Sequence, residues 1–307
     1  MVRFVLRRLL QSIPVLFIIV TLTFFLVRLA PGGPFDSERA LSPEALAQLR
    51  QEYNLDAPLY QQYVEYLWDL LHGDLGPSMK KPERTVAEWI ALRLPVSLEL
   101  GVYALALALL IGLTAGCIAA LRPNTLNDYV PMSLAMAGIC IPNFVLGPLL
   151  VLVFALKLEW FPVAGWAFPA DKVLPSLTLG AIYAAYVARM TRGSLLSVLA
   201  QDFIRTARAR GVSEAGVVLR HALRGALQPV VAFLGPAAAG LLTGSFVVEK
   251  IFQIPGLGRE FVNAAFHRDY TMVMGTVLLF AVLIMLFNLA VDAVQAWLDP
   301  RLRHEQF

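Results

Sequence analysis

Six apolar runs, separated by polar or turn-rich segments, dominate the chain. They cover approximately Leu9–Val27, Val96–Leu121, Tyr129–Leu156, Val173–Ala188, Val230–Val248 and Met272–Leu298. A helix that crosses a bilayer core about 30 Å thick needs about 20 residues, and every run except the fourth meets or nearly meets that length. The fourth reaches it only by continuing past Arg189, whose long side chain can extend to the membrane interface. The pattern predicts six spanning helices with both termini on one side.

The first run is predicted to be an uncleaved spanning helix within residues 1–30. Three arginines, Arg3, Arg7 and Arg8, precede it, as they would a secretory signal. However, the run is longer than a typical signal core, and Val27-Arg28-Leu29-Ala30-Pro31 contains no small-x-small cleavage site.

Residues 31–94 form the one long polar segment, and we expect short helices in it. Ser42-Pro43-Glu44 has the composition of a helix start, with a helix running to about Glu52. Asp56 and Pro58 open a second helix, which closes at His72-Gly73, and Thr85 with Glu88 forms a capping box before the next apolar run. Aromatic residues recur along the second helix, so these helices are predicted to lie at the outer membrane interface, with a small soluble cap as the alternative.

The composition is also that of a membrane protein. Of 307 residues, 58% are apolar and 15% charged, and the mean hydropathy is +0.66. Soluble domains have about 25% charged residues, so the chain is predicted to be an all-α polytopic membrane protein. The net charge of +3 does not indicate a nucleic-acid partner. Cys117 and Cys140 lie in apolar runs and are interpreted as small core residues.

Charge determines the expected orientation. Arginines gather on the side of the amino terminus, at Arg3, Arg7, Arg8, Arg122, Arg189, Arg192, Arg205, Arg208, Arg210, Arg220, Arg224, Arg301 and Arg303. The opposite side has about as many basic residues, but over half of them lie in the long first loop, which the positive-inside rule discounts. That rule places both termini in the cytoplasm and residues 31–94 outside, in the periplasm.

Within the runs, glycines such as Gly112 and Gly180 are interpreted as close helix-packing positions, and prolines such as Pro142 predict kinks or broken helices. The acids noted within the runs are Glu99 and Asp292, both near run ends. We expect each to be an interfacial or capping group rather than a coupling-ion ligand.

One arginine-rich interruption, residues 201–229, carries the candidate functional site. Helical spacing predicts a short helix over Asp202–Arg210, with Phe203, Thr206, Ala207 and Arg210 on one face. A break follows at Gly211. Ser213 is placed to cap a second helix, in which Ala215, Leu219, Ala222 and Leu223 share one side and Arg220, His221 and Arg224 the other. On physical grounds alone, a basic loop resting on anionic lipid headgroups is an equal alternative.

The segments RTARARG and RHALRGALQPV resemble the coupling loop of ABC-importer membrane subunits, in the form carried by bacterial di- and oligopeptide permeases. RLAPGGPF, HGDLGPS, IFQIPGLG and LDPR are similar to the same family and occur in the expected order. Arg205, Thr206, Ala207 and Gly211 occupy the positions of the family's Glu-Ala-Ala-then-Gly pattern. Arg205 and Thr206 depart from the general importer pattern, although the peptide branch commonly has Arg-Thr there. Gly225 stands where that branch usually has Asn.

The resemblance implies a type I importer permease, in which residues 95–307 form a five-helix core whose loop docks on an ATPase subunit. The implied contact residues are Phe203, Arg205, Thr206, Ala207, Arg208, Arg210, Gly211, Ser213, Arg220 and His221. The implied partners are a homologous second permease, two cytoplasmic ATPases that bind ATP and Mg, a periplasmic or lipid-anchored peptide-binding protein, and membrane lipid. The implied location is the bacterial inner membrane.

The chain itself is expected to have no enzymatic activity, cofactor or metal, because it lacks a Gly-x-x-x-x-Gly-Lys-Ser/Thr loop and the common intramembrane enzyme motifs. Its substrate is predicted to be oligopeptides. Dipeptides, glutathione and nickel chelates remain alternatives within the family. An ion-coupled carrier and a non-transporting scaffold are rival classes, although a carrier normally needs ionisable groups near the midplane.

Overall fold

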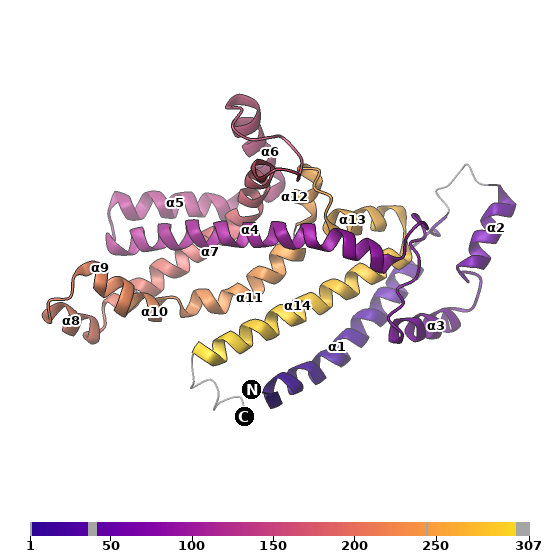
Figure 1. The fold of residues 1–307 in the computed structure, drawn as a ribbon, viewed down its shortest axis with the longest axis horizontal. Helices are drawn as coiled ribbons and strands as arrows, with labels where there is room; N and C mark the ends of the chain where they lie inside the picture. Colours follow the sequence, from indigo (N-terminus) through magenta and orange to yellow (C-terminus); the bar gives the residue numbers. More distant parts are fainter. Residues whose placement is uncertain (1, 36–41, 244, 299–307) are drawn as a thin grey trace. The chain divides into compact units, whose positions relative to one another are not determined.

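The computed structural model describes residues 2–35, 42–243 and 245–298, and the secondary structure in these ranges is helical, apart from one isolated β-bridge between Pro77 and Thr85 (Figure 1). The chain forms two compact units. Unit 1 comprises residues 1–96 and 255–285, and unit 2 comprises residues 97–254 and 286–307. Two of the three boundaries between the units fall inside long helices, α4 (Val86–Leu121) and α14 (Tyr270–Leu298), and the third falls at Ile254-Pro255, outside any helix.

Unit 1 contains α1 (Val2–Leu29), α2 (Pro43–Glu52), α3 (Leu59–Leu71), α13 (Leu257–His267) and the beginnings of α4 and α14. The predicted helix signals in the polar segment are confirmed. The Ser42 side chain accepts a hydrogen bond from Ala45 N, and Gly73 after α3 has φ +77°. Thr85 N donates to Glu88 Oε2 while Glu88 N donates to Thr85 Oγ1, which completes the capping box of α4.

Two aromatic side chains of α3 pack on α1. Phe24 is fully buried, and the Tyr63 and Tyr66 rings lie 5.1 and 5.7 Å from its ring. The Thr21 and Tyr63 hydroxyls are 2.6 Å apart. The polar segment is therefore joined to the first apolar helix within this unit, because Tyr63 and Tyr66 of α3 are half-buried against α1, whereas Tyr60 and Trp68 stay exposed.

Unit 2 contains α5 (Leu126–Cys140), α6 (Asn143–Leu150), the π-helix η1 (Val151–Lys157), the 3-10 turn η2 (Pro169–Lys172) and α7 (Val173–Leu199). It continues with α8 (Asp202–Ala209), α9 (Glu214–Gly216), the π-helix η3 (Val217–Ala222), α10 (Leu223–Ala226), α11 (Gln228–Thr243) and α12 (Phe246–Ile251). The later parts of α4 and α14 complete it.

Glycines let α4 and α7 approach closely, as the small residues predicted. A Cβ added at Gly112 would lie 2.7 Å from Ala184 O, and one at Gly180 would lie 2.6 Å from Ala104 O. Backbone atoms cannot yield as a flexible side-chain end can, so any side chain at either position would force the two helices apart. Cys117 is half-buried, whereas Cys140 is exposed, so the core interpretation was wrong for Cys140.

Four of the described helices are long and apolar enough to cross a membrane, and two bent helix pairs raise the total to as many as six. The fourth run does continue past Arg189, because α7 ends at Leu199. The third run is not one straight helix: it bends by 114° between α5 and the α6–η1 segment, at Ile141-Pro142. Pro142 has no N–H to donate and stands as the cap before α6, so the helix is interrupted there.

Candidate functional site

Helices α8, α9, η3 and α10 make a short, folded coupling loop, which we define as residues 201–229. Figure 1 shows these elements following the end of α7 and leading into α11. The loop belongs to unit 2, and its apolar side chains pack against the last turns of α4 and α7, where Ala120 and Leu195 are buried.

The interior of the loop differs in detail from the helical-face prediction. Ile204, Ala207, Val217 and Ala222 are buried in one core together with Ala226. Phe203, which was placed on the face of Ala207, is instead 48% exposed, and Leu219 is 67% exposed. Ile204, which the sequence analysis did not single out, takes the central position.

The π-helical geometry of η3 explains why Leu219 is exposed. A π-helix turns less per residue than an α-helix, because its repeating hydrogen bond spans five residues, so positions four and five apart lie on one face. Val217 and Ala222 are five apart and both fully buried, whereas a 3.6-residue period places Leu219 with Ala222. Ala222 was therefore correctly assigned to the apolar side, and Leu219 was not.

Gly211 makes the elbow between α8 and α9, as predicted. Its φ of +77° lies in the left-handed region that favours glycine, and a Cβ there would meet nothing within 4 Å. Gly211 N donates to Arg208 O at 3.0 Å, and Ser213 Oγ accepts from Gly216 N at the start of α9.

An ion pair closes the outside of this elbow. Arg208 Nε and Glu214 Oε1 are 2.8 Å apart, and a second hydrogen bond joins the same two groups at 3.2 Å. The hydrogen bonds to Glu214 raise the pKa of Arg208 above its usual value, so the guanidinium stays charged. Both side chains are exposed, so the ion pair contributes little to stability and mainly orients α8 and α9 across the elbow.

Most of the predicted contact residues share one property: they are exposed on this folded loop. They are Phe203, Arg205, Thr206, Arg208, Arg210, Gly211, Ser213, Arg220 and His221. Ala207 is the exception, because it faces the interior.

One polar contact joins the coupling loop to α7, and a second, nearby, joins α7 to α5. Ser194 Oγ on α7 donates to Ala226 O at 2.6 Å. Nearby, Arg192 of α7 binds Asp128 at the start of α5 through two hydrogen bonds of 2.5 and 2.6 Å, and Asn124 N also donates to that carboxylate. Asp128 is buried, so this bidentate pair determines how α5 meets α7 on the side of the loop.

Four acids are buried in the described part of the chain and were missed: Asp128, Asp171, Glu249 and Asp269. Two of them were overlooked because they flank the predicted apolar runs. Asp128 directly precedes the third run, and Glu249 directly follows the fifth. Glu249 is fully buried in α12, where its carboxylate accepts from Ser97 Oγ of α4 and Ser245 Oγ, both at 2.7 Å. Glu99, which was considered, is partly exposed and accepts hydrogen bonds from Lys172 Nζ and Trp166 Nε1.

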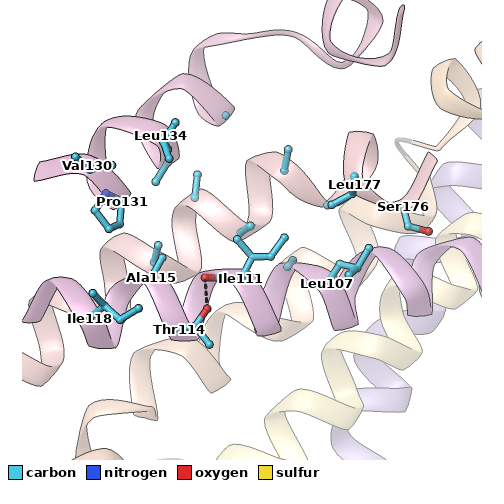
Figure 2. A pocket seen from close by; sticks show the side chains of 18 residues that line it. Leu107, Ile111, Thr114, Ala115, Ile118, Val130, Pro131, Leu134, Ser176 and Leu177 are labelled. Carbon is cyan, nitrogen blue, oxygen red and sulfur yellow. Dashed lines mark hydrogen bonds between the residues drawn. The ribbon is translucent and has the colours of Figure 1, made fainter. Parts of the chain in front are cut away.

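An apolar groove of about 420 Å³ lies between α4, α5 and α7 (Figure 2). Figure 2 shows Val130, Pro131 and Leu134 of α5 on one side and Ile111 and Ile118 of α4 on another. The groove has no charged side chain in its lining, so it suits an apolar occupant. Across the described part of the chain, no cluster of three or more His, Cys, Asp or Glu side chains could hold a metal ion.

Comparison with known proteins identifies the family. Residues 112–304 match the family described as binding-protein-dependent transport system inner membrane component, and residues 1–100 match its N-terminal companion family. The chain belongs to this family. It is accordingly an inner-membrane component of a transport system, not the system's ATPase.

Several curated relatives match along their whole length. The chain is 49% identical to the oligopeptide transport system permease protein OppB of Salmonella typhimurium and 47% identical to that of Haemophilus influenzae, in both cases over 99% of this chain and 100% of the relative. It is also 44% identical to the dipeptide transport system permease protein DppB of Bacillus subtilis, over 99% of this chain and 98% of the relative.

Solved structures share the fold. A crystal form of the MetNI methionine ABC transporter, in an inward-facing conformation, matches with a TM-score of 0.58 at 20% identity, covering 69% of this chain and 97% of that one. A second crystal form of the same transporter matches with a TM-score of 0.57 at 18% identity, covering 69% of this chain and 96% of that one. The fold class inferred from the sequence, that of a type I ABC-importer permease, is confirmed.

Proposed function

We propose that this chain is the membrane-spanning permease subunit of an ATP-driven importer of oligopeptides. The observation that carries the proposal is identity of 47–49% with oligopeptide permeases over the entire chain. The dipeptide permease matches less closely, at 44%, so oligopeptides are favoured within the family. Six spans supply half of a translocation pathway, and a homologous second permease supplies the other half.

The coupling loop transmits the action of a cytoplasmic ATPase to the apolar helices. Its support is structural: a small core holds the loop in one shape, while Phe203 and Leu219 project outward among arginines. Phenylalanine and arginine are enriched in protein interfaces, and arginine is among the residues that dominate their binding energy. Two such ATPases bind ATP and Mg, and a peptide-binding protein delivers substrate from outside.

An ion-coupled carrier is the less favoured function. Such a carrier needs ionisable groups that exchange with water near the midplane. Of the acids in the described helices, Glu249 is fully buried between two serine hydroxyls, and Asp128 is bound by Arg192. These contacts are typical of acids with a structural role. The folded coupling loop instead favours a transporter whose energy comes from a separate ATPase subunit.

We place both termini and the coupling loop in the cytoplasm on the basis of arginine distribution. A topology test uses single cysteines in a chain with Cys117 and Cys140 replaced by alanine. Cysteines at Tyr60 and Phe168, which are 73% and 70% exposed, are expected to react with an impermeant maleimide added to spheroplasts. A cysteine at the exposed Arg210 is expected to react only after the membrane is permeabilised. Labelling at position 210 in sealed spheroplasts would reverse the orientation and remove the coupling role.

Affinity purification of the tagged chain from its own membrane tests the assembly. We expect a second permease and P-loop ATPases totalling two per complex, identified by mass spectrometry, with ATP hydrolysis stimulated by peptide-loaded binding protein. Recovery of the chain as a lone subunit or as a homo-oligomer without any ATPase would contradict the proposal.

A further inference from the structure

A second pocket, of about 370 Å³, lies within unit 1, far along the sequence from the coupling loop. It is lined by the Ser78–Lys81 turn, by Trp89 of α4, by α13 and by the start of α14. Its volume falls in the range of small-molecule sites. The lining combines lysine, amide and imidazole groups with the apolar side chains of Ala264 and Met272.

The pocket's walls are held by one buried carboxylate. Asp269 is 3% exposed and accepts from Ser78 Oγ, from Met79 N at 3.2 Å and from Met272 N at 3.1 Å. These bonds join the 78–81 turn to the start of α14, so the pocket is preformed. Because Asp269 already accepts these hydrogen bonds, Glu260 is the acid in the lining that remains to pair with nearby cations.

Two buried donor atoms in this region, Arg93 Nε and Trp89 Nε1, have no hydrogen-bond partner among the described residues. Lys81 Nζ is 2.7 Å from Glu260 Oε2, while Arg93 Nε is 3.8 Å from Oε1 and makes no hydrogen bond. The Trp89 indole N–H is buried and has no acceptor among the described residues. An unmet buried donor is costly, so its presence beside a pocket indicates an acceptor that binds there.

Positive charge is concentrated at the same place. Lys81 Nζ lies 4.5 Å from the centre of the Trp89 ring, and the Arg84 and Arg93 guanidinium carbons lie 5.5 and 5.4 Å from it. The lining itself holds Lys80 and Lys81 and the carboxylates of Asp269 and Glu260, whereas Arg84 and Arg93 add positive charge beside the Trp89 ring. The occupant that satisfies both the charge and the unmet donors is a further carboxylate.

We propose that this pocket binds the C-terminal carboxylate of a peptide. The carboxylate takes the end of the pocket next to Trp89 and Lys81, with the Lys81 side chain moving aside from the indole ring that it covers. The adjoining terminal side chain rests on Ala264 and Met272. This inference rests on the proposed function, because peptides are the substrate class that the family relationship favours.

The test compares trialanine with trialanine amide, which differ only in the terminal charge. Binding to the purified complex is measured by saturation-transfer NMR, which suits weak ligands. We expect the acid to bind at least about tenfold more tightly than the amide, as for hydrogen bonds to a charged group. Trp89→Phe keeps the ring but removes the N–H, and it should lose most of that preference. Lys81→Gln should do the same, whereas Trp160→Phe, at an exposed site in unit 2, should keep it.

Equal binding of the acid and the amide would overturn the inference, as would an unchanged preference in both Trp89→Phe and Lys81→Gln. ATP-dependent trialanine uptake is measured on the same preparation. If the complex takes up trialanine but binds the acid and the amide equally, the pocket has no role in binding the carboxylate and the proposed function still stands. If the wild-type complex takes up no trialanine, the proposed function itself is contradicted.

Discussion

Gly211→Val is expected to abolish peptide uptake while leaving the chain inserted and bound to its sister subunit. Valine is β-branched and strongly disfavours the φ of +77° found at this elbow. The added strain is on the order of 1–3 kcal/mol, which shifts the loop away from its bent form by about 5- to 150-fold. Because the Cβ would meet no neighbour, steric collision is not the cause. Uptake of labelled peptide and retention of the ATPase subunits on the purified complex are the measurements.

Two controls isolate the backbone effect. Gly193→Val introduces the same side chain on α7, where a Cβ also meets nothing within 4 Å and φ lies outside the left-handed range. It should transport nearly normally. Gly211→Asn should retain more uptake than Gly211→Val, since asparagine tolerates the left-handed conformation better. Normal uptake by Gly211→Val would exclude a bent elbow as the coupling element.

Ala207→Asp is expected to eliminate uptake for a reason that the sequence alone did not reveal. Ala207 is 7% exposed and packs with Ile204 and Val217 in the loop's interior. A carboxylate there loses its hydration among apolar neighbours, at a cost of several kcal/mol. The loop should therefore unfold locally, and the ATPase subunits should dissociate from the complex or lose their stimulation by peptide-loaded binding protein.

Ala209→Asp is the matched control, because Ala209 is exposed on the same helix. It should retain most of the uptake. If the loop merely rests on lipid, Ala207→Asp should transport almost normally, and joint neutralisation of Arg205, Arg208 and Arg210 should be the more harmful change. That ordering of the variants would contradict docking on a protein.

The sequence was informative where physical signals are local. The six apolar runs correspond to helices because hydrocarbon-spanning segments need length and apolar composition above all. The helix caps at Ser42 and Thr85, and the left-handed elbow at Gly211, were likewise predicted, since each depends on the chemistry of one or two residues.

Features that depend on tertiary contacts were not predicted. A standard helical period placed Phe203 beside Ala207 and did not anticipate the π-helical turn that buries Val217 with Ala222. Asp128 and Glu249 were overlooked since both lie just outside an apolar run, and their partners Arg192 and Ser97 are distant in sequence. Pro142 signalled a kink, but the 114° angle between the two segments could not be derived from it.

The most direct test of the account is peptide uptake by proteoliposomes that contain the purified complex, with the energy source controlled. Peptide-loaded binding protein is added outside, and labelled trialanine inside is counted with ATP enclosed, with a non-hydrolysable ATP analogue enclosed, or with only a proton gradient imposed. We expect accumulation with enclosed ATP alone, and we expect Gly211→Val to lose it. Accumulation driven by the proton gradient without ATP would contradict the proposed function.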